Sequence, residues 1–464
     1  MIATVKTEST DRFDLTEGDI VKKLLRLSLP TVGSQLTQMA YSFADMFWLG
    51  RLSSRAVAVS GAVAIFMWLS MAPQAFGGKG AEIGVSQNLG RRDYGAARDF
   101  IRGSLFVAAI LGVAVWMAYT LSAPYMIGFL HIRETQVAES AVRYLRISAI
   151  AMPFNYLHYS AVSAFNASGN SAVPFYCNMI FLVVNAAIDP LFINTIGGGM
   201  GAEGAAAATV LCQIVSCVTI LILLKRSGHG EIRGMRLTGV PRREYLRAIA
   251  RWGSPAALEG FCFTFFIILV SRVVASFGSE ALAVQRIGNQ ADQFSYFIAA
   301  GYGAALTAFI GQNYGAGRFD RIRRAFRLST AVMALWGVGA TAFCFFGGRL
   351  FFRLFVPGET AVIEMGARYL RVFAACQVAA CLEGVGSSVF RGQGRTLFPS
   401  VVGVATHVLR VVFAWRLSAM SLGADGIWIA LMGSAFLRGA GIYLAGLRAL
   451  RGQPEPEPER GAGY

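Results

Sequence analysis

Long apolar blocks dominate the pattern of hydrophobic and polar positions along the chain. Blocks of roughly 18–25 residues alternate with short Arg-rich segments over most of the sequence. An apolar block of this length spans the hydrocarbon core of a bilayer as one α-helix. Strands of outer-membrane barrels alternate apolar and polar residues with a period of two, and these blocks do not. The pattern therefore predicts an all-α polytopic membrane protein.

Twelve apolar blocks are long enough to be transmembrane helices. We expect them at residues 24–50, 57–79, 98–121, 141–165, 173–195, 203–224, 249–277, 281–308, 326–348, 367–389, 398–418 and 425–447. The fold class predicted from them is a bundle of twelve transmembrane helices in two pseudo-symmetric six-helix lobes.

The two lobes are predicted from an internal repeat with a constant offset of 225 residues. The matches are Pro30 with Pro255, Gln87-Asn88 with Gln312-Asn313, Tyr144 to Arg146 with Tyr369 to Arg371, and Pro174 with Pro399. Six helices per repeat is an even number, so both halves insert in the same orientation, and such repeats typically enclose a central site. The predicted parts are an N-terminal segment (1–23), an N-terminal lobe (24–224), a linker (225–248), a C-terminal lobe (249–447) and a tail (448–464).

The basic residues between the blocks predict the orientation in the membrane. Eight Lys and Arg residues lie between Lys225 and Arg251 and five between Arg318 and Arg327, whereas the connection at 278–280 has none. Because Lys and Arg collect on the cytoplasmic side, both termini are expected in the cytoplasm. No cleavable signal peptide is indicated, and we expect a multi-pass protein of the plasma (inner) membrane.

Composition excludes several other classes of protein. The chain is 55% hydrophobic and only 15% charged, too little charged surface for soluble domains of this total length. The net charge of +16 comes from basic residues between the apolar blocks, so no nucleic-acid partner is expected. The seven cysteines have no metal-ligand spacing, and no HExxH, GxSxG or Walker-type motif is present. We expect neither an enzyme nor a cofactor.

Polar residues inside the first lobe are candidates for chemistry. Thr31, Gln35, Gln38 and Asp45 follow one face of the first helix, and Asn185 and Asp189 are one turn apart on the fifth. A charged residue at mid-membrane costs roughly 2.5–3.5 kcal/mol on insertion scales, so the two aspartates should face the protein interior. If they meet, they could hold a proton, or bind sodium together with amide oxygens. A buried polar clamp between helices is the alternative.

Proline at position 30 interrupts the first helix before Asp45. Because proline lacks an N–H and clashes with the preceding turn, it permits a kink there. A bend at Pro30 would couple ion binding at Asp45 to the release of substrate. A static kink is the alternative hypothesis.

The second lobe lacks the carboxylate pair. Positions 45 and 189 correspond to Val270 and Ala414, so coupling is expected in one lobe only. Glu383 and Arg410 lie in apolar blocks and could form a buried ion pair, with a structural or a coupling role. His158 is interpreted as a hydrogen-bonded packing residue, with a titrating role as the alternative.

Several segments together resemble the multidrug and toxic compound extrusion (MATE) family. They are SLPTVGSQLTQMAYSFADMFWLGRL (28–52), GAEIGVSQNLGRRDYGAAR (80–98), YLRISAIAMPF (144–154), NAAIDPLFI (185–193) and RGQGRTLFPS (391–400). Their order and spacing carry the resemblance, which extends over about residues 20 to 447. It implies two six-helix lobes forming a V and the extrusion of amphipathic compounds in exchange for sodium or protons.

The resemblance also implies a cation site. The family's site uses an Asp on helix 1, an Asn and an Asp on helix 5, and a Thr on helix 6, which correspond here to Asp45, Asn185, Asp189 and Thr209. With sodium as the coupling ion, Asp45, Asn185 and Asp189 would be its ligands. Some branches carry a deep Glu on helix 7, where this sequence has Phe263. That departure argues against a second cation site.

The expected function is a secondary antiporter that exports organic, cationic or amphipathic compounds in exchange for H⁺ or Na⁺. Residues that could line its substrate cavity are Gln35, Gln38, Asn155, His158, Asp292, Glu383 and Arg410. The expected partners are a small-molecule substrate and the lipid bilayer, with the chain as a monomer. The alternative is a flippase for lipid-linked precursors, since such flippases share paired six-helix lobes.

Overall fold

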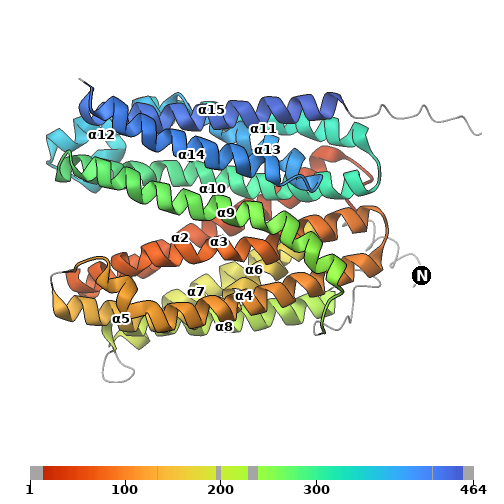
Figure 1. The fold of residues 1–464 in the computed structure, drawn as a ribbon, viewed down its shortest axis with the longest axis horizontal. Coiled ribbons are helices and arrows are strands. Elements are labelled where there is room, and N and C mark those ends of the chain that lie inside the picture. Colours follow the sequence, from red (N-terminus) through yellow and green to blue (C-terminus); the bar gives the residue numbers. More distant parts are fainter. Residues whose placement is uncertain (1–13, 133, 195–199, 228–238, 421, 453–464) are drawn as a thin grey trace, which may run out of the picture. The chain divides into compact units, whose positions relative to one another are not determined.

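The computed structural model describes residues 14–132, 134–194, 200–227, 239–420 and 422–452. Within them the chain forms fourteen helices and no β-strand (Figure 1). The helices of the first repeat are α2 (Ile20–Leu52), α3 (Ser54–Gly90), α4 (Tyr94–Gly128), α5 (Thr135–Ala149), α6 (Met152–Ala167), α7 (Ala172–Asn194) and α8 (Gly201–Ser227). Those of the second are α9 (Arg243–Ala275), α10 (Ser279–Gly315), α11 (Phe319–Phe355), α12 (Thr360–Ala374), α13 (Gln377–Gly392), α14 (Leu397–Ser418) and α15 (Gly423–Arg451). The predicted tail beyond residue 452, the first thirteen residues and residues 228–238 of the predicted linker lie outside the described residues.

Two of the twelve predicted spans are broken helices. The span expected at 141–165 consists of α5 and α6, and the span expected at 367–389 consists of α12 and α13, which are bent by 44°. Nine described helices are long and apolar enough to cross a membrane by themselves, and the bent pair makes a tenth candidate. The prediction of continuous helices at these two places is therefore wrong.

Close packing accompanies both breaks. A Cβ added to Gly112 of α4 would lie 2.6 Å from the Cα atom of Pro153, and one added to Gly337 of α11 would lie 2.8 Å from the Cα atom of Val378. Each helix after a break therefore approaches its neighbour at a distance that only glycine allows. Pro153 also favours a new helix start in the first repeat, because it lacks an N–H. The second repeat keeps the break without a proline, so the proline alone does not explain it.

The helix boundaries repeat with the predicted offset of 225 residues. Both ends of α3 match those of α10, and the same holds for α5 with α12 and for α6 with α13. The repeat inferred from scattered identical residues is therefore a repeat of structure.

The described chain divides into two compact units. Leu29–Ala257 belong to the first unit, and Leu15–Ser28 join Leu258 and the following residues in the second. The division falls inside α2 and α9, within two residues of their prolines Pro30 and Pro255, and not within the predicted linker. The first part of α9 is accordingly embedded in the first unit, where Ile249 is fully buried.

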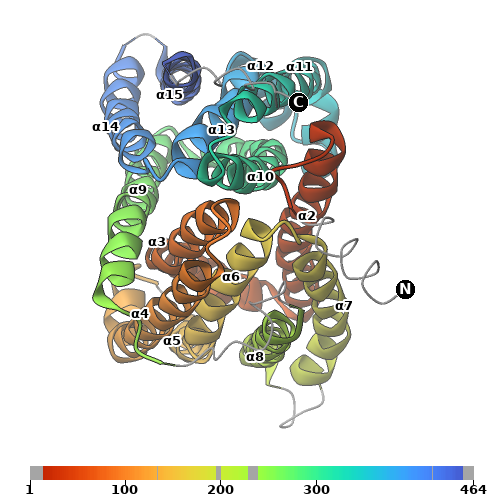
Figure 2. The same ribbon diagram turned by 90° about the vertical axis from the view of Figure 1, so that its right-hand side faces the viewer.

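Equivalent helices occupy the centre of each unit. In the first unit α6 packs against α3, α4 and α8, and in the second α13 packs against α10, α11 and α15 (Figure 2). The core of the second unit surrounds the fully buried Tyr369 and Trp428, whose rings meet edge to face. The broken spans thus provide the central helix of each unit.

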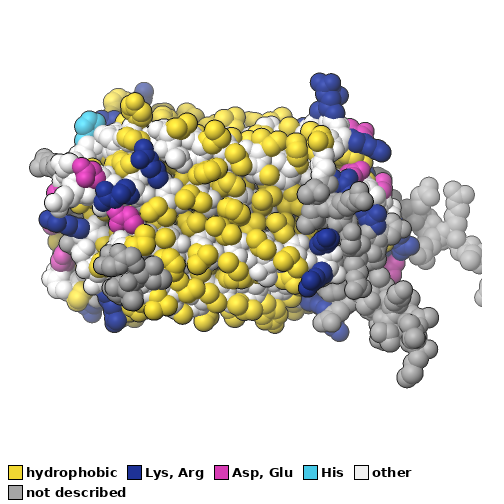
Figure 3. Space-filling model, turned by 90° about the horizontal axis from the view of Figure 1, so that it is seen from below, with side chains coloured by type: hydrophobic (Ala, Val, Ile, Leu, Met, Phe, Trp, Pro, Cys, Tyr) yellow, Lys and Arg dark blue, Asp and Glu magenta, His cyan; other side chains and the backbone are white. Residues whose placement is uncertain are grey.

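The outer surface fits a lipid environment. The face drawn in Figure 3 is apolar across its middle, and charged side chains gather toward its two ends. Large apolar side chains point outward on spanning helices: Leu121 of α4 is 73% exposed and Val183 of α7 is 65% exposed. Such exposure over contiguous area marks contact with a membrane or a partner rather than with water.

Candidate cation site

Helix α7 carries the two polar residues at the centre of the candidate site. Asn185 and Asp189 are fully buried and one helical turn apart, so both side chains lie on the same face. The Asn185 Nδ2 atom donates a hydrogen bond to Asp189 Oδ1 at 3.0 Å. Pro190 follows inside the helix and removes one backbone N–H, which leaves the carbonyl of Ala186 without its helical donor. The amide therefore orients the carboxylate at a weakened point of the helix.

Helix α2 contributes the second carboxylate. The half-buried Asp45 lies with its carboxyl group within hydrogen-bonding reach of that of Asp189. One turn earlier, the Tyr41 hydroxyl donates to the carbonyl oxygen of Phe181 at 2.7 Å, which joins α2 to α7. The structure thus brings together Asp45, Asn185 and Asp189, as the sequence predicts. Tyr41 was not predicted, although its spacing of four residues from Asp45 places it on the same face.

The site has more negative charge than its surroundings compensate. Asp45 Oδ1, Asn185 Oδ1 and Asp189 Oδ2 are buried oxygens that receive no hydrogen bond from the described residues. No Lys or Arg of the described chain forms an ion pair with either carboxylate. Buried carboxylates without counter-charges are costly in a medium of low dielectric constant. A proton or a small cation would remove that cost.

The donor set indicates which ions fit. Two carboxylates and one amide oxygen are hard ligands, the kind that bind hard cations. Among the residues that the structure describes, no group of three or more His, Cys, Asp or Glu side chains could hold a metal ion. Oxygen ligands of this kind suit a proton or a hard cation better than a soft transition metal.

Helix α8 closes the site with a residue that was not predicted. Cys212 lies near both Asn185 and Asp189. Thr209 is one turn earlier on α8 and half-buried, and no hydrogen bond within the described chain joins it to Asp45, Asn185 or Asp189. The role predicted for Thr209 stays a prediction.

The predicted cavity residues of the first unit have different environments. Gln35 is half-buried and Gln38 is exposed. Asn155 Nδ2 donates to Gln213 Oε1 at 3.0 Å, which links α6 to α8. The Nε2 atom of His158 is buried and has no hydrogen-bond partner among the described residues. A role for these residues in substrate binding stays a prediction.

The ion pair in the second unit is not the predicted one. Glu383 pairs with Arg438 at 2.9 Å, and Arg410 Nε donates to Ser434 Oγ at 2.9 Å. The prediction that Glu383 and Arg410 form a pair is therefore wrong. Arg438 is closer because α13, which carries Glu383, packs extensively against α15 and only slightly against α14. Arg438 lies inside the predicted span 425–447, and an arginine in an apolar span was the sequence signal for a partner of Glu383.

Asp292, the last of the predicted cavity residues, lies on α10. Gln377 Nε2 is 3.5 Å from an Asp292 carboxylate oxygen. Elsewhere in this unit, Arg438 Nη1 and His407 Nε2 are 3.4 Å from each other. At the positions equivalent to Asp45 and Asp189, the fully buried Val270 and Ala414 belong to the apolar core. The carboxylate pair is a feature of one repeat only.

Two structurally equivalent repeats of membrane-spanning helices, with a buried polar site in one of them, define a polytopic membrane transporter. The family model MatE matches residues 30–191 and again residues 255–416, two matches separated by the offset of the repeat. The chain belongs to the MatE family.

Known proteins resemble this chain over most of its length. It is 24% identical over 430 residues to the probable multidrug resistance protein NorM of Thermotoga maritima, with 90% of each chain covered. It is 26% identical over 435 residues to the probable multidrug resistance protein YpnP of Bacillus subtilis, covering 92% of this chain and 94% of that protein. The solved outward-facing structure of a multidrug resistance MATE family transporter matches with a TM-score of 0.87 at 22% identity, over 95% of this chain and 98% of that one. MATE transporter structures have twelve transmembrane helices in two lobes, which is the predicted fold class.

Proposed function

We propose that this protein is a secondary antiporter that exports organic, cationic or amphipathic compounds in exchange for protons or sodium. The observation that carries the proposal is the pair of neighbouring carboxylates, Asp45 and Asp189, with buried oxygens that receive no hydrogen bond. The names of the relatives, probable multidrug resistance proteins, support export of several compounds.

The geometry suggests a role for each residue. Asp45 and Asp189 bind the incoming ion, and the hydrogen bond from Asn185 holds Asp189 in position. Binding of a cation neutralises the repulsion between the carboxylates, so α2 and α7 can approach more closely when the ion is bound. Asp45 shares α2 with Pro30, which gives that helix a place to bend in response. The ion would thereby favour one conformation, and substrate the other.

The membrane arrangement is part of the same proposal. Basic segments between the spans support cytoplasmic termini, and the family supports a place in the plasma membrane. The chain would act as a monomer. A flippase for lipid-linked precursors is not favoured, because the relatives are named for drug resistance and Glu383 already pairs with Arg438.

Transport into vesicles of defined orientation tests the proposal. The purified protein is reconstituted in liposomes, and movement of a fluorescent monovalent organic cation is followed under a sodium gradient or under a pH gradient. We expect one gradient to drive transport, and Asp189→Asn to abolish the driven component. Asp425→Asn, at the start of α15, is the matched control and should transport normally. Transport that is independent of both the sodium gradient and the pH gradient, or that is unchanged in Asp189→Asn, would refute antiport through this site.

A further inference from the structure

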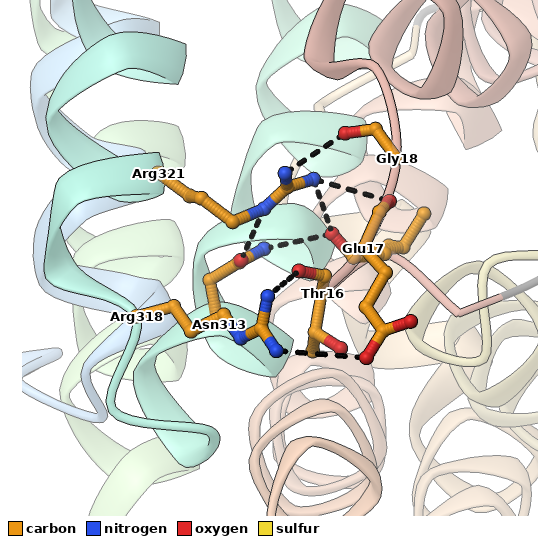
Figure 4. Close-up of polar contacts among 7 residues, drawn as sticks. Thr16, Glu17, Gly18, Asn313, Arg318 and Arg321 are labelled. Carbon is orange, nitrogen blue, oxygen red and sulfur yellow. Dashed lines mark hydrogen bonds and ion pairs between the residues drawn. The ribbon is translucent and has the colours of Figure 1, made fainter. Parts of the chain in front are cut away.

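A short non-helical segment precedes α2 and is held by side chains of the second unit. The carbonyl oxygens of four successive residues, Leu15 to Gly18, each accept a hydrogen bond from this unit (Figure 4). The backbone N–H of Leu15 donates to Gln312 Oε1 at 3.0 Å. Backbone groups outside regular structure need such partners when they are buried, and Leu15 is only 2% exposed. We call residues 15–18 the strap.

Arg321 is the centre of the contacts with the strap. Its Nη1 donates to the carbonyl oxygen of Gly18 at 2.8 Å, and its Nη2 reaches those of Leu15 at 3.3 Å and Glu17 at 3.2 Å. Arg318 adds a bond to the carbonyl oxygen of Thr16 at 3.2 Å and an ion pair with Glu17 at 3.5 Å. A planar guanidinium with fixed donor directions can serve three acceptors at once, which an ammonium group cannot do as well.

The guanidinium is itself held in place. Arg321 Nε donates to Asn313 Oδ1 at 3.1 Å, while Asn313 Nδ2 donates to the carbonyl oxygens of Leu15 at 3.1 Å and Phe309 at 2.8 Å. Asn313 is fully buried, so its rotamer is restricted by packing. We call Gln312, Asn313, Arg318 and Arg321 the clamp.

The other repeat has different residues at the positions of the two clamp arginines. Asn88, the equivalent of Asn313, keeps the bond to its own helix, from Nδ2 to the carbonyl oxygen of Gly84 at 2.7 Å. The positions equivalent to Arg318 and Arg321 are Asp93 and Ala96. The fold therefore does not require these arginines, because the equivalent helix ends form without them.

The strap runs directly into the helix that carries the candidate cation site. Gly18 adopts a φ of +75°, which turns the chain, and Asp19 Oδ1 then accepts from the backbone N–H of Lys22 at 2.7 Å to cap α2. Residues up to Ser28 belong to the second unit, and from Leu29 the same helix belongs to the first. Asp45 lies further along that continuous helix.

We infer that the clamp anchors the start of α2 on the second unit, and that Arg321 is a positioning residue for transport. The inference rests on the proposed function. When the start of α2 is anchored, a conformational change of α2 at Asp45 must bend the helix at Pro30 and be transmitted to the second unit. With its start released, α2 moves without moving that unit. Loss of the clamp should therefore slow turnover and leave substrate binding intact.

Two measurements on the reconstituted full chain test this inference. The first is hydrogen–deuterium exchange of the backbone amides at the strap. Because Arg321→Ala removes three of the bonds to the strap, we expect exchange there to speed up by about tenfold or more. Arg321→Lys should give a smaller increase. The control is Arg324→Ala, since Arg324 is an exposed arginine on the same helix α11.

The second measurement is gradient-driven transport with the kinetic constants separated. For Arg321→Ala we expect kcat to fall about fivefold to tenfold and KM to stay within about twofold. Arg321→Lys should regain part of the rate, and Arg324→Ala should match the wild type. The wild type and Arg321→Ala should have the same thermal unfolding midpoint. If the midpoint of Arg321→Ala is lower, the kcat of Arg321→Lys relative to the wild type decides the test.

The outcomes separate the two proposals. Faster exchange at the strap with unchanged kcat would overturn the positioning role, and unchanged exchange would overturn the clamp itself. Transport that is lost in Asp189→Asn but kept in Arg321→Ala leaves the proposed function standing and refutes the inference. A wild-type chain without gradient-driven transport refutes the proposed function, and the role of Arg321 with it.

Discussion

The two repeats place different chemistry at equivalent positions. In the first unit Asp45 and Asp189 lie side by side without counter-charges, whereas Val270 and Ala414 occupy the same places in the apolar core of the second. In the second unit, Glu383 has a paired guanidinium, that of Arg438, at 2.9 Å. A carboxylate with its own arginine is electrically satisfied, but a pair of carboxylates is satisfied only by an added ion. The same scaffold thus carries a carboxylate pair without a described counter-charge in one repeat and an ion-paired carboxylate in the other.

Removing the carboxylates should have the largest effect. Asp45→Asn and Asp189→Asn are each expected to reduce ion-driven transport by about 100-fold or more, because each leaves a single carboxylate for the cation. The double variant should be no worse than either single one, since groups that act as a unit are not additive. Initial rates in liposomes give this comparison. Additive losses would mean that the two aspartates act separately.

Breaking the ion pair of the second unit should affect stability more than coupling. Glu383→Gln leaves Arg438 without its carboxylate, and we expect a loss of about 2 kcal/mol, less than for a fully buried pair because both side chains are nearly one-fifth exposed. Thermal unfolding in detergent measures the loss. Replacing both partners together, by Gln at position 383 and Met at position 438, should recover most of it. A fully stable Glu383→Gln variant that no longer couples to the gradient would instead place Glu383 in the transport cycle.

The amide beside the carboxylates should have an intermediate effect. Asn185→Ala removes the hydrogen bond that orients Asp189, and we expect the apparent affinity for the coupling ion to fall about tenfold while the maximal rate changes little. The dependence of the initial rate on ion concentration measures this. Asn178→Ala, on the same helix, serves as the comparison. A loss as complete as that of Asp189→Asn would make Asn185 an indispensable ligand.

The smallest effect is expected on α8. Thr209→Val keeps the volume of the side chain and removes a hydroxyl that makes no described hydrogen bond to the carboxylates, so the ion affinity should change by less than about twofold. Cys212→Ala, which alters a side chain next to Asp189, should change the affinity more. The same ion titration compares the two. A tenfold loss in Thr209→Val would show that the hydroxyl reaches the ion during transport.

Much of the molecule was predictable because its determinants are local or periodic. Apolar length predicts the spans, a constant offset predicts the repeat, and the cost of a charge in hydrocarbon predicts that Asp45 and Asp189 face the interior. Their meeting followed from that reasoning and from the family resemblance together. The breaks between α5 and α6 and between α12 and α13 were missed, because hydrophobicity is continuous across them and close approach to Gly112 and Gly337 is a tertiary property.

Residue types and their spacing alone determined that this chain has membrane-spanning helices, that it contains an internal repeat, and that its first half holds acidic residues inside apolar spans. These conclusions rest on transfer free energies, which depend on composition and spacing. Tertiary structure alone decided which partner each charged group has. Arg438 displaced Arg410 as the partner of Glu383, and Arg321 bound a segment about 300 residues away in sequence. Such pairings depend on how helices pack and where side chains point, and the spacing of residues along the sequence does not specify either.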